Sequence, residues 1–356
     1  MVKASEIYNG KTVLITGDTG FKGSWLSLWL SGMGAEVVGY SLAPPSNPNL
    51  FDTLHLQDEI RHIHGNIKDA HLILSVFKTH EPEFVFHLAA QPIVKRSYRE
   101  PYYTLETNVM GTANVLECIK VTDSVKSCII VTSDKCYQNT ESGSAFIETD
   151  PLGGNDPYSA SKACAEIVVD AYRKSFFKDS SACSVSSVRA GNVIGGGDWG
   201  KDRLVPDCIK SLSKERPIIL RSPSSIRPWQ YVLEPLYGYL QLATLMYVHG
   251  KEYEGAWNFG SNESYSVEFL VDLIIKNWGG GECLIDATQQ PHEDKLLCLD
   301  STKAYNLLGW DTIYDIDTAV KRTVDWYKAF YASDVDMYEY SLEEIVEYER
   351  RRNSQK

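Results

Sequence analysis

The sequence predicts an α/β protein built on a doubly wound parallel sheet, with a smaller, mainly helical lobe toward the C-terminus. Two observations predict the sheet: apolar runs without polar alternation recur through the first half of the chain, and a helical stretch separates each run from the next. Strands of this kind are buried on both faces, as they are when helices cover both sides of a parallel sheet. A third observation is a glycine-rich turn after the first run, which predicts a ligand at the carboxyl ends of the strands.

The elements follow one another in a regular order. We expect strands at 11–17, 36–42, 59–65, 83–90, 127–133 and 183–193, and helices at 21–34, 69–80, 101–121 and 157–177. After about Gly191 the segments become Gly-rich and turn-like, with helices expected at 234–250, 266–279, 301–309 and 315–332. This pattern predicts a Rossmann-type domain over residues 1–190 and a substrate lobe over 191–356, with part of 229–260 returning to the first domain. We expect the charged tail 347–356 to be frayed.

Composition excludes several classes of protein. The 356 residues are 43% hydrophobic and 23% charged, which is ordinary for a globular protein, and the net charge of −12 argues against nonspecific nucleic-acid binding. No apolar run is long enough to span a membrane, and the eight cysteines are scattered without a CxxC pattern. His62 and His64 form a pair without a third ligand. We expect a cytoplasmic protein with reduced thiols and no metal, with neither nucleic acid nor membrane as a partner.

The turn TGDTGFKG places Gly17, Gly20 and Gly23 between the first strand and a helix. Glycines permit the tight turn and the close approach that a dinucleotide diphosphate needs at a helix N-terminus. The spacing is GxxGxxG, so its strand–turn–helix context carries the inference. The second strand ends in VVGYSLAPPSNP, without an acidic residue for the ribose of NAD or an Arg for the 2′-phosphate of NADP, so both cofactors stay open. Asn66 could reach the adenine edge or simply form a turn.

Chemistry-bearing side chains gather after the fifth strand and on the next helix. The stretch IIVTSDKCYQ places Ser133, Asp134 and Lys135 where a buried strand ends, either as an exposed turn with an Asp–Lys salt bridge or as groups that handle protons on a substrate. PYSASK places Tyr158 and Lys162 on one face of a helix, which could also be a plain exposed face. A phenol with a pKa of about 10 is a poor base, but a nearby ammonium and a cationic nicotinamide would lower that pKa. We therefore expect Tyr158 to act as a base and Lys162 to assist it and bind the nicotinamide ribose.

Five motifs together resemble the extended short-chain dehydrogenase/reductase family over most of the chain. They are GxxGxxG, HLAAQ (87–91), TNVMGT (107–112), Ser133 and the Tyr158/Lys162 pair. The resemblance implies Ser133, Tyr158 and Lys162 as the catalytic triad and NAD as a tightly held, regenerated cofactor, although the missing acidic residue departs from the family. The cofactor-binding residues that it implies are Gly17, Gly20, Phe21, Lys22, Gly23, Asn66, Ile67, Leu88, Ala89, Ala90, Asn108, Tyr158 and Lys162.

Longer segments narrow the resemblance to one group of sugar-nucleotide 4,6-dehydratases. GFKGSWLSLWL, AAQPIVKRSY, TSDKCY, SVRAGNVIGGGDWGKDRLVPD and SIRPWQYVLEPL are similar to the CDP-glucose 4,6-dehydratase subfamily, which has Lys where the others have Glu in Thr-Asp-Glu. The resemblance implies conversion of CDP-D-glucose to CDP-4-keto-6-deoxy-D-glucose and water, toward deoxy and dideoxy sugars of surface polysaccharides such as lipopolysaccharide. By analogy Asp134 is the acid at O6 and Lys135 the base at C5. Alternatively the two share their charges, and Lys135 only positions.

The substrate would lie on loops of the second half of the chain. Arg203 and Arg227 are candidates for the diphosphate, since a planar guanidinium binds it bidentately, and Asn192 could contact a phosphate or the sugar. Trp199 could stack on the pyrimidine or ribose, or pack its own loop. Glu293 and its neighbour in QPHEDK could close the site. The expected substrate-binding residues are Gln91, Asn192, Trp199, Arg203, Leu204, Arg227 and His292.

Two other functions stay open beside this one. A 4-epimerase, or a dehydratase for another nucleotide sugar, would share most motifs, but an epimerase eliminates no water and has no need of the Asp134/Lys135 pair. A nonenzymatic NAD-sensing protein could keep the glycines and lose the triad, all of which is present here. The long helices 101–121 and 157–177 carry more apolar surface than one sheet face needs. Related enzymes pair two such helices across a dimer axis, so we expect a homodimer through a four-helix bundle.

Overall fold

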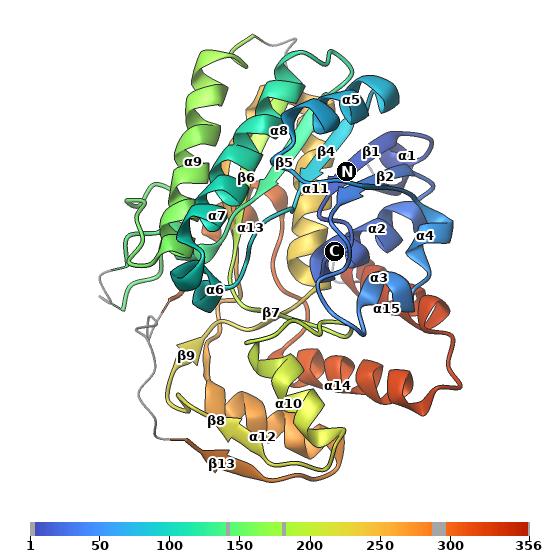
Figure 1. The fold of residues 1–356 in the computed structure, drawn as a ribbon, viewed down its shortest axis with the longest axis vertical. Helices are drawn as coiled ribbons and strands as arrows, with labels where there is room; N and C mark the ends of the chain where they lie inside the picture. Colours follow the sequence, from blue (N-terminus) through green and yellow to red (C-terminus); the bar gives the residue numbers. More distant parts are fainter. Residues whose placement is uncertain (1–3, 140–142, 180–182, 287–296, 355–356) are drawn as a thin grey trace.

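The computed structural model describes residues 4–139, 143–179, 183–286 and 297–354, and its centre is a seven-stranded sheet (Figure 1). All neighbouring strands pair in parallel, in the order β11-β6-β5-β4-β1-β2-β3. The strands are β1 (Thr12–Thr16), β2 (Glu36–Ser41), β3 (Arg61–His64), β4 (Phe84–His87), β5 (Ser127–Val131), β6 (Ser184–Ala190) and β11 (Gly255–Phe259). The predicted doubly wound parallel sheet is confirmed.

Both faces of the sheet are buried because successive strand residues point to opposite sides. Leu14 and Val85 join the core under α5, α8 and α9, whereas Val13 and Phe84 join the larger core under α2, α11 and α15. The helices are α1 (Ala4–Tyr8), α2 (Phe21–Gly32), α3 (Leu50–Thr53), α4 (Leu56–Glu59), α5 (Ala70–His80), α6 (Val94–Arg99), α7 (Pro101–Leu105), the π-helix η1 (Glu106–Met110), α8 (Gly111–Lys120), the 3₁₀ turn η2 (Asp134–Cys136), α9 (Pro157–Ser175), α11 (Leu233–His249), the 3₁₀ turn η3 (Gly250–Tyr253), α13 (Thr302–Leu308) and α15 (Met337–Ser354).

The remaining elements form the lobe at the bottom of Figure 1, beyond the carboxyl ends of the strands. They are α10 (Leu204–Leu212), α12 (Val267–Trp278), α14 (Ile316–Ala332) and three small ribbons that pair β7 (Val193–Ile194) with β10 (Gln230–Tyr231), β8 (Ile218–Leu220) with β13 (Cys283–Ile285), and β9 (Ile226–Arg227) with β12 (Tyr265–Ser266). The strand order reverses between β1 and β4, so the crevice at this switch point opens toward the lobe. Within the residues that the structure describes, no helix has the length and apolarity to cross a bilayer.

The C-terminal tail differs from the sequence-based expectation. Residues 347–354 belong to α15, so the prediction of a frayed tail is wrong there. Tyr348 is fully buried, and the Arg352 guanidinium, 5% exposed, donates a hydrogen bond to the Asp311 carbonyl at 2.6 Å. Arg350 and Arg351 are exposed, whereas Tyr348 and Arg352 are buried and the Glu349 carboxylate accepts a hydrogen bond from Trp29 of α2, so this face of the helix packs on the rest of the protein.

Candidate active site

The glycine turn forms a cradle with room for backbone atoms only. Gly17 has φ +82°, and a Cβ there would lie 2.7 Å from the Ala89 nitrogen after β4. A Cβ on Gly23 would lie 2.0 Å from the Gly17 carbonyl oxygen. Gly20 caps α2 without a side-chain hydrogen bond, which leaves the N–H groups of the first turn available to an anion. The turn therefore fits a dinucleotide diphosphate, as the spacing predicts.

An acidic side chain reaches β2 from the turn itself. Asp18 is fully buried, and its Oδ2 lies 2.7 Å from Nδ1 of His62 on β3. A Cβ on Gly39 of β2 would lie 2.2 Å from the same oxygen, and Oδ1 has no hydrogen-bond partner within the described part of the chain. The sequence predicts no carboxylate at β2, because Asp18 belongs to the glycine turn and only the adjacency of β1, β2 and β3 brings it there.

Some of the other residues expected around the cofactor are half-buried next to the glycine turn, and others are engaged within the protein. Leu88, Ala89 and Ala90 are half-buried just after β4, as are Phe21 and Lys22 at the start of α2. Ile67 is 5% exposed and lies under Gly111, while the side chain of Asn66 accepts a hydrogen bond from the Lys68 nitrogen, the turn-forming alternative.

Asn108 and Gln91 are buried and hold each other. Asn108 Oδ1 accepts from the Gln91 nitrogen at 2.8 Å, and its Nδ2 donates to Ser161 on α9 at 2.8 Å. The carboxamide of Gln91 donates to Thr104 and accepts from the Ile93 nitrogen. These hydrogen bonds fix the loop after β4 against α7 and α9, so the Gln91 side chain is engaged within the protein.

The predicted triad comes together at the carboxyl end of β5. Ser133 caps η2, accepting from the Lys135 nitrogen at 3.2 Å and donating to Asp134 Oδ1 at 2.9 Å. Asp156 caps α9 through the nitrogen of Tyr158, and one turn later Lys162 Nζ donates to the Val131 carbonyl at 3.2 Å. Burial raises the pKa of Tyr158 to about 12, although a hydrogen bond with Ser133 opposes the rise. Burial also lowers the pKa of Lys162 to about 8.

Charges in the crevice act on one another across the two lobes. Burial raises the pKa of Asp134, although Lys135, Ser133 and Arg227 oppose the rise. The raised pKa favours a protonated carboxyl. Burial lowers the pKa of Lys22 to about 8, helped by repulsion from Arg203. In the site, burial thus favours the neutral form of the Asp134 carboxyl and of the Lys22 and Lys162 amines, and it keeps the Tyr158 phenol protonated.

The lobe residues expected at the substrate have mixed surroundings. The Arg203 guanidinium forms an ion pair with Asp198 at 2.8 Å, a partner that the sequence did not indicate. Arg203 also acts electrostatically on Tyr158. Arg227 is 7% exposed on β9 and acts on Asp134. Both cations therefore lie close enough to Asp134 and Tyr158 to act on them electrostatically.

Of the remaining candidates, two are half-buried and one is enclosed. Asn192 lies half-buried after β6, with its carbonyl bonded to the Gln230 nitrogen, and Leu204 is half-buried at the start of α10. Trp199 is 3% exposed and packs among aromatic rings of α14, with 4.8 Å between its ring centroid and that of Phe330. This is the second of the two expected roles, in which the tryptophan packs its own loop. His292 and Glu293 lie outside the described residues.

Comparisons with known proteins find sequence relatives over most of the chain. The family model described as GDP-mannose 4,6 dehydratase matches residues 14–323. The CDP-glucose 4,6-dehydratase of Salmonella typhimurium is 45% identical over 348 residues, 96% of this chain and 97% of that protein. A dTDP-glucose 4,6-dehydratase of Xanthomonas campestris is 26% identical over 336 residues, 89% of this chain and 93% of that protein.

Solved structures share the fold. The dTDP-glucose 4,6-dehydratase of Bacillus anthracis in complex with NAD has a TM-score of 0.73 at 23% identity, covering 90% of this chain and 97% of that one. The UDP-glucose 4-epimerase of Thermus thermophilus in complex with NAD has a TM-score of 0.78 at 24% identity, covering 89% and 99%. Dehydratases and epimerases thus share one fold, and side chains have to distinguish them.

Proposed function

Since the chain belongs to the nucleotide-sugar dehydratase family that the GDP-mannose 4,6 dehydratase model describes, within the extended short-chain dehydrogenases/reductases, we propose that it converts CDP-D-glucose to CDP-4-keto-6-deoxy-D-glucose and water. One observation carries the proposal: Asp134, buried and with a raised pKa, follows Ser133 and precedes Lys135 at the end of β5, beside Tyr158. An epimerase eliminates no water and has no use for such an acid. The relative that shares 45% identity acts on CDP-glucose by its name.

The cofactor that fits the glycine cradle is NAD. The turn offers backbone N–H groups to its diphosphate, and Lys162, one turn from Tyr158 on α9, would hold the nicotinamide ribose. When bound, NAD would supply a hydride acceptor for C4 of the sugar and then a hydride donor for C6, so it would be regenerated in each turnover and could be held tightly. The solved relatives that share the fold carry NAD by their titles.

The first half of the reaction depends on the phenol. Tyr158 removes the proton of the 4-hydroxyl, and Ser133, which hydrogen-bonds Tyr158, also holds the sugar O4. Since burial raises the pKa of Tyr158, the phenolate needs positive charge nearby, and Arg203 supplies it, while Lys162 lies one turn further along α9.

The second half eliminates water across C5 and C6. Asp134 donates a proton to the departing O6, a role that its raised pKa supports, and Lys135 removes the proton at C5. A proton then returns to C5. The assignment of Lys135 as the base follows the analogy with Thr-Asp-Glu dehydratases.

A panel of substrates tests the proposal. The purified protein is incubated separately with CDP-, dTDP-, GDP- and UDP-glucose without added cofactor. The mass of each nucleotide sugar is then measured by mass spectrometry. We expect loss of one water from CDP-glucose alone. Loss from another nucleotide sugar would contradict the base preference, and no loss after addition of NAD would contradict the dehydratase.

We also propose a homodimer through α7, α8 and α9. Large apolar side chains lie exposed on this face, among them Tyr102 at 77%, Met110 at 55% and Ile167 at 57%. We expect light scattering to give a dimer that Ile167→Glu converts to a monomer. The control Ile285→Glu, at a 64% exposed position on β13, should remain dimeric.

The location of the protein and the use of its product are proposals as well. Eight free cysteines support a cytoplasmic location. The 4-keto-6-deoxy product is the class of compound from which deoxy and dideoxy sugars of surface polysaccharides such as lipopolysaccharide are made, and we propose that the product has this use.

A further inference from the structure

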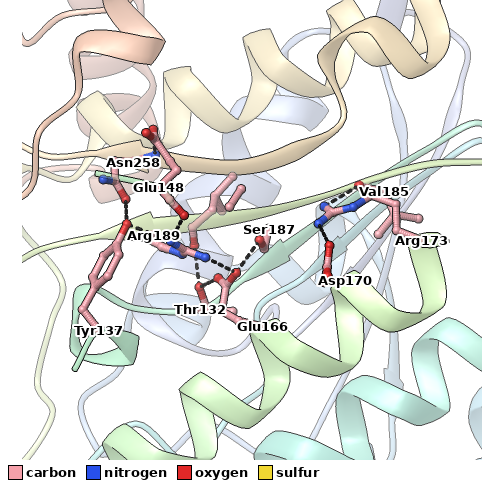
Figure 2. A network of polar contacts seen from close by, with 12 residues as sticks. Thr132, Tyr137, Glu148, Glu166, Asp170, Arg173, Val185, Ser187, Arg189 and Asn258 are labelled. Atoms are coloured by element: carbon pink, nitrogen blue, oxygen red, sulfur yellow. Dashed lines mark hydrogen bonds and ion pairs between the residues drawn. The ribbon is translucent and has the colours of Figure 1, made fainter. Parts of the chain in front are cut away.

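A buried ion pair lies directly behind the catalytic segment (Figure 2). Arg189 of β6 and Glu166 of α9 are each 3% exposed, and Nη2 lies 2.7 Å from Oε2. Burial alone would raise the pKa of Glu166, but Arg189 and the hydroxyls of Thr132 and Ser187 bring it below its ordinary value. The pair is therefore charged, and both Glu166 oxygens and both Nη atoms of Arg189 are hydrogen-bonded, whereas Arg189 Nε has no partner within the described residues.

The pair holds both ends of the segment that carries Ser133, Asp134 and Lys135. On one side, the Thr132 hydroxyl donates to Glu166 Oε1 at 2.5 Å. On the other, Arg189 Nη1 donates to the Tyr137 hydroxyl at 2.8 Å, and the guanidinium lies 4.8 Å from the centre of the Tyr137 ring.

Further contacts make this anchor rigid. The Tyr137 hydroxyl donates to Asn258 Oδ1 on β11 at 2.7 Å, and Arg189 Nη1 also donates to the Glu148 carbonyl. Figure 2 shows Tyr137, Glu148 and Glu166 around Arg189, with Asn258 next to the Tyr137 hydroxyl. The segment is thereby tied to β6, β11 and α9 at once.

The same helix carries the groups that the segment has to meet. Tyr158, Lys162 and Glu166 follow one another at intervals of four along α9, so they share one face of the helix. Lys162 Nζ reaches the Val131 carbonyl, next to Thr132. A shift of the segment relative to Glu166 would therefore change its distance to Tyr158 and Lys162.

We propose that the Arg189–Glu166 pair is a positioning element that clamps the segment 133–136 at both ends and so sets Asp134 and Lys135 against the sugar while Tyr158 and Lys162 stay in place. The inference rests on the proposed function and deepens it. It predicts that loosening either end slows the elimination of water, which depends on Asp134 and Lys135, more than the oxidation at C4, for which the segment supplies Ser133 and the base stays on α9. The hydride removed from C4 then has no acceptor at C6, and the cofactor stays reduced on the enzyme.

Four substitutions around the Arg189–Glu166 pair test the clamp. Thr132→Val and Tyr137→Phe each release one end of the segment. Ser187→Ala is the matched control, because Ser187 Oγ donates to the same carboxylate at 2.7 Å but belongs to β6. Thr132→Ser restores the hydroxyl and should restore turnover. Each variant is measured for turnover of CDP-glucose, affinity for CDP-glucose, thermal stability and the ultraviolet absorbance of reduced nicotinamide during turnover.

We expect Thr132→Val and Tyr137→Phe to lower kcat by about tenfold or more, the size of a lost hydrogen bond to a charged group, with affinity for CDP-glucose little changed. Reduced cofactor should accumulate in these two variants and not in Ser187→Ala. Accumulation in none of them, or equally in Ser187→Ala, would overturn the clamp while leaving the function intact. A wild-type protein that releases no water from any nucleotide sugar would overturn the proposed function, and the clamp with it.

Discussion

Tyr158 and Lys162 lie one turn apart on α9, and burial drives both toward their neutral forms. The pKa of the phenol rises to about 12 and that of the ammonium falls to about 8. At neutral pH the phenol is therefore protonated and a poor base, whereas an amine with a pKa of about 8 still carries most of its charge. The positive charge of a nicotinamide and of neighbouring cations is what would bring Tyr158 into a basic form, so the base becomes active only when the cofactor is in place.

Replacement of the phenol removes the base for the first step. We expect Tyr158→Phe to lower kcat by a factor of about 10² to 10⁴, the usual contribution of general base catalysis, with affinity for CDP-glucose retained. Calorimetric titration and steady-state rates check this. Turnover within a few-fold of wild type would contradict the assignment of Tyr158.

Replacement of the buried acid separates the two halves of the reaction. Asp134→Asn keeps the shape of the side chain and its hydrogen bond with Ser133 but cannot donate the proton to O6. We expect oxidation at C4 to continue, reduced cofactor to accumulate, and release of water to slow by about 10² to 10⁴. Stopped-flow absorbance with product analysis measures both. A variant that never reduces its cofactor would place Asp134 in the first step instead.

The glycine turn should fail when it gains a side chain. A Cβ at position 23 would lie 2.0 Å from the Gly17 carbonyl oxygen, so Gly23→Ala must distort the cradle. We expect purified Gly23→Ala to carry little or no nicotinamide cofactor. The control is Gly32→Ala in the last turn of α2, where the new atom meets only the end of the Leu342 side chain at 3.2 Å. Equal cofactor content in the two variants would contradict the role of the turn.

Asp18 offers a way to test cofactor choice. Its carboxylate lies against Gly39 of β2, near the strand end where an adenosine ribose binds in this fold, so it should repel the 2′-phosphate of NADP. We expect Asp18→Asn to shift the ratio of NAD to NADP affinities toward NADP by about tenfold. Glu36→Gln, exposed at the opposite end of β2, is the control. An unchanged ratio in Asp18→Asn would show that this charge does not act on the ribose.

Docking of α15 should depend on pH through Glu234. This side chain is fully buried on α11, where its oxygens accept from the Tyr314 nitrogen at 2.9 Å and from the Tyr348 hydroxyl at 2.6 Å, with Arg352 at 3.6 Å. Burial raises its pKa from 4.5 to about 7. The folded state thus binds the proton more tightly than the unfolded state, and the associated stability is present below about pH 4.5 and is lost as the pH rises through about 7.

The size of this effect follows from the shift in pKa. We expect the free energy of unfolding to fall by about 3 kcal/mol over that interval beyond the change seen in Glu234→Gln, which mimics the protonated form. Denaturant unfolding of both proteins at several pH values measures the difference. Parallel pH curves for the two proteins would contradict the raised pKa.

The sequence predicts those features whose signal is local. The glycine turn and the Tyr158/Lys162 spacing are each read within a few residues, and the structure brings Ser133 to the same place because neighbouring parallel strands end at one edge. Buried strands such as β5 are also evident, since they are apolar throughout.

Features made by distant segments could not be predicted in this way. The contact of Asp18 with His62 requires β1, β2 and β3 to be adjacent, and the clamp joins Thr132 to residues on α9 and β6. The strand β11 begins at a glycine and is short, so its sequence shows no clear apolar pattern that would predict a strand. For α15, a charged composition conceals an inner face on which Ile345 and Tyr348 are buried.

The central claim is an intramolecular oxidation, elimination and reduction, and isotope transfer tests it most directly. CDP-glucose labelled with deuterium at C4 is converted by the protein in ordinary water, and the product is examined by NMR and mass spectrometry; a second conversion uses unlabelled substrate in heavy water. The account predicts the C4 deuterium at C6 of the 4-keto-6-deoxy product and, in heavy water, one solvent deuterium at C5. Label returned to C4, with the 6-hydroxyl retained, would contradict it and identify an epimerase.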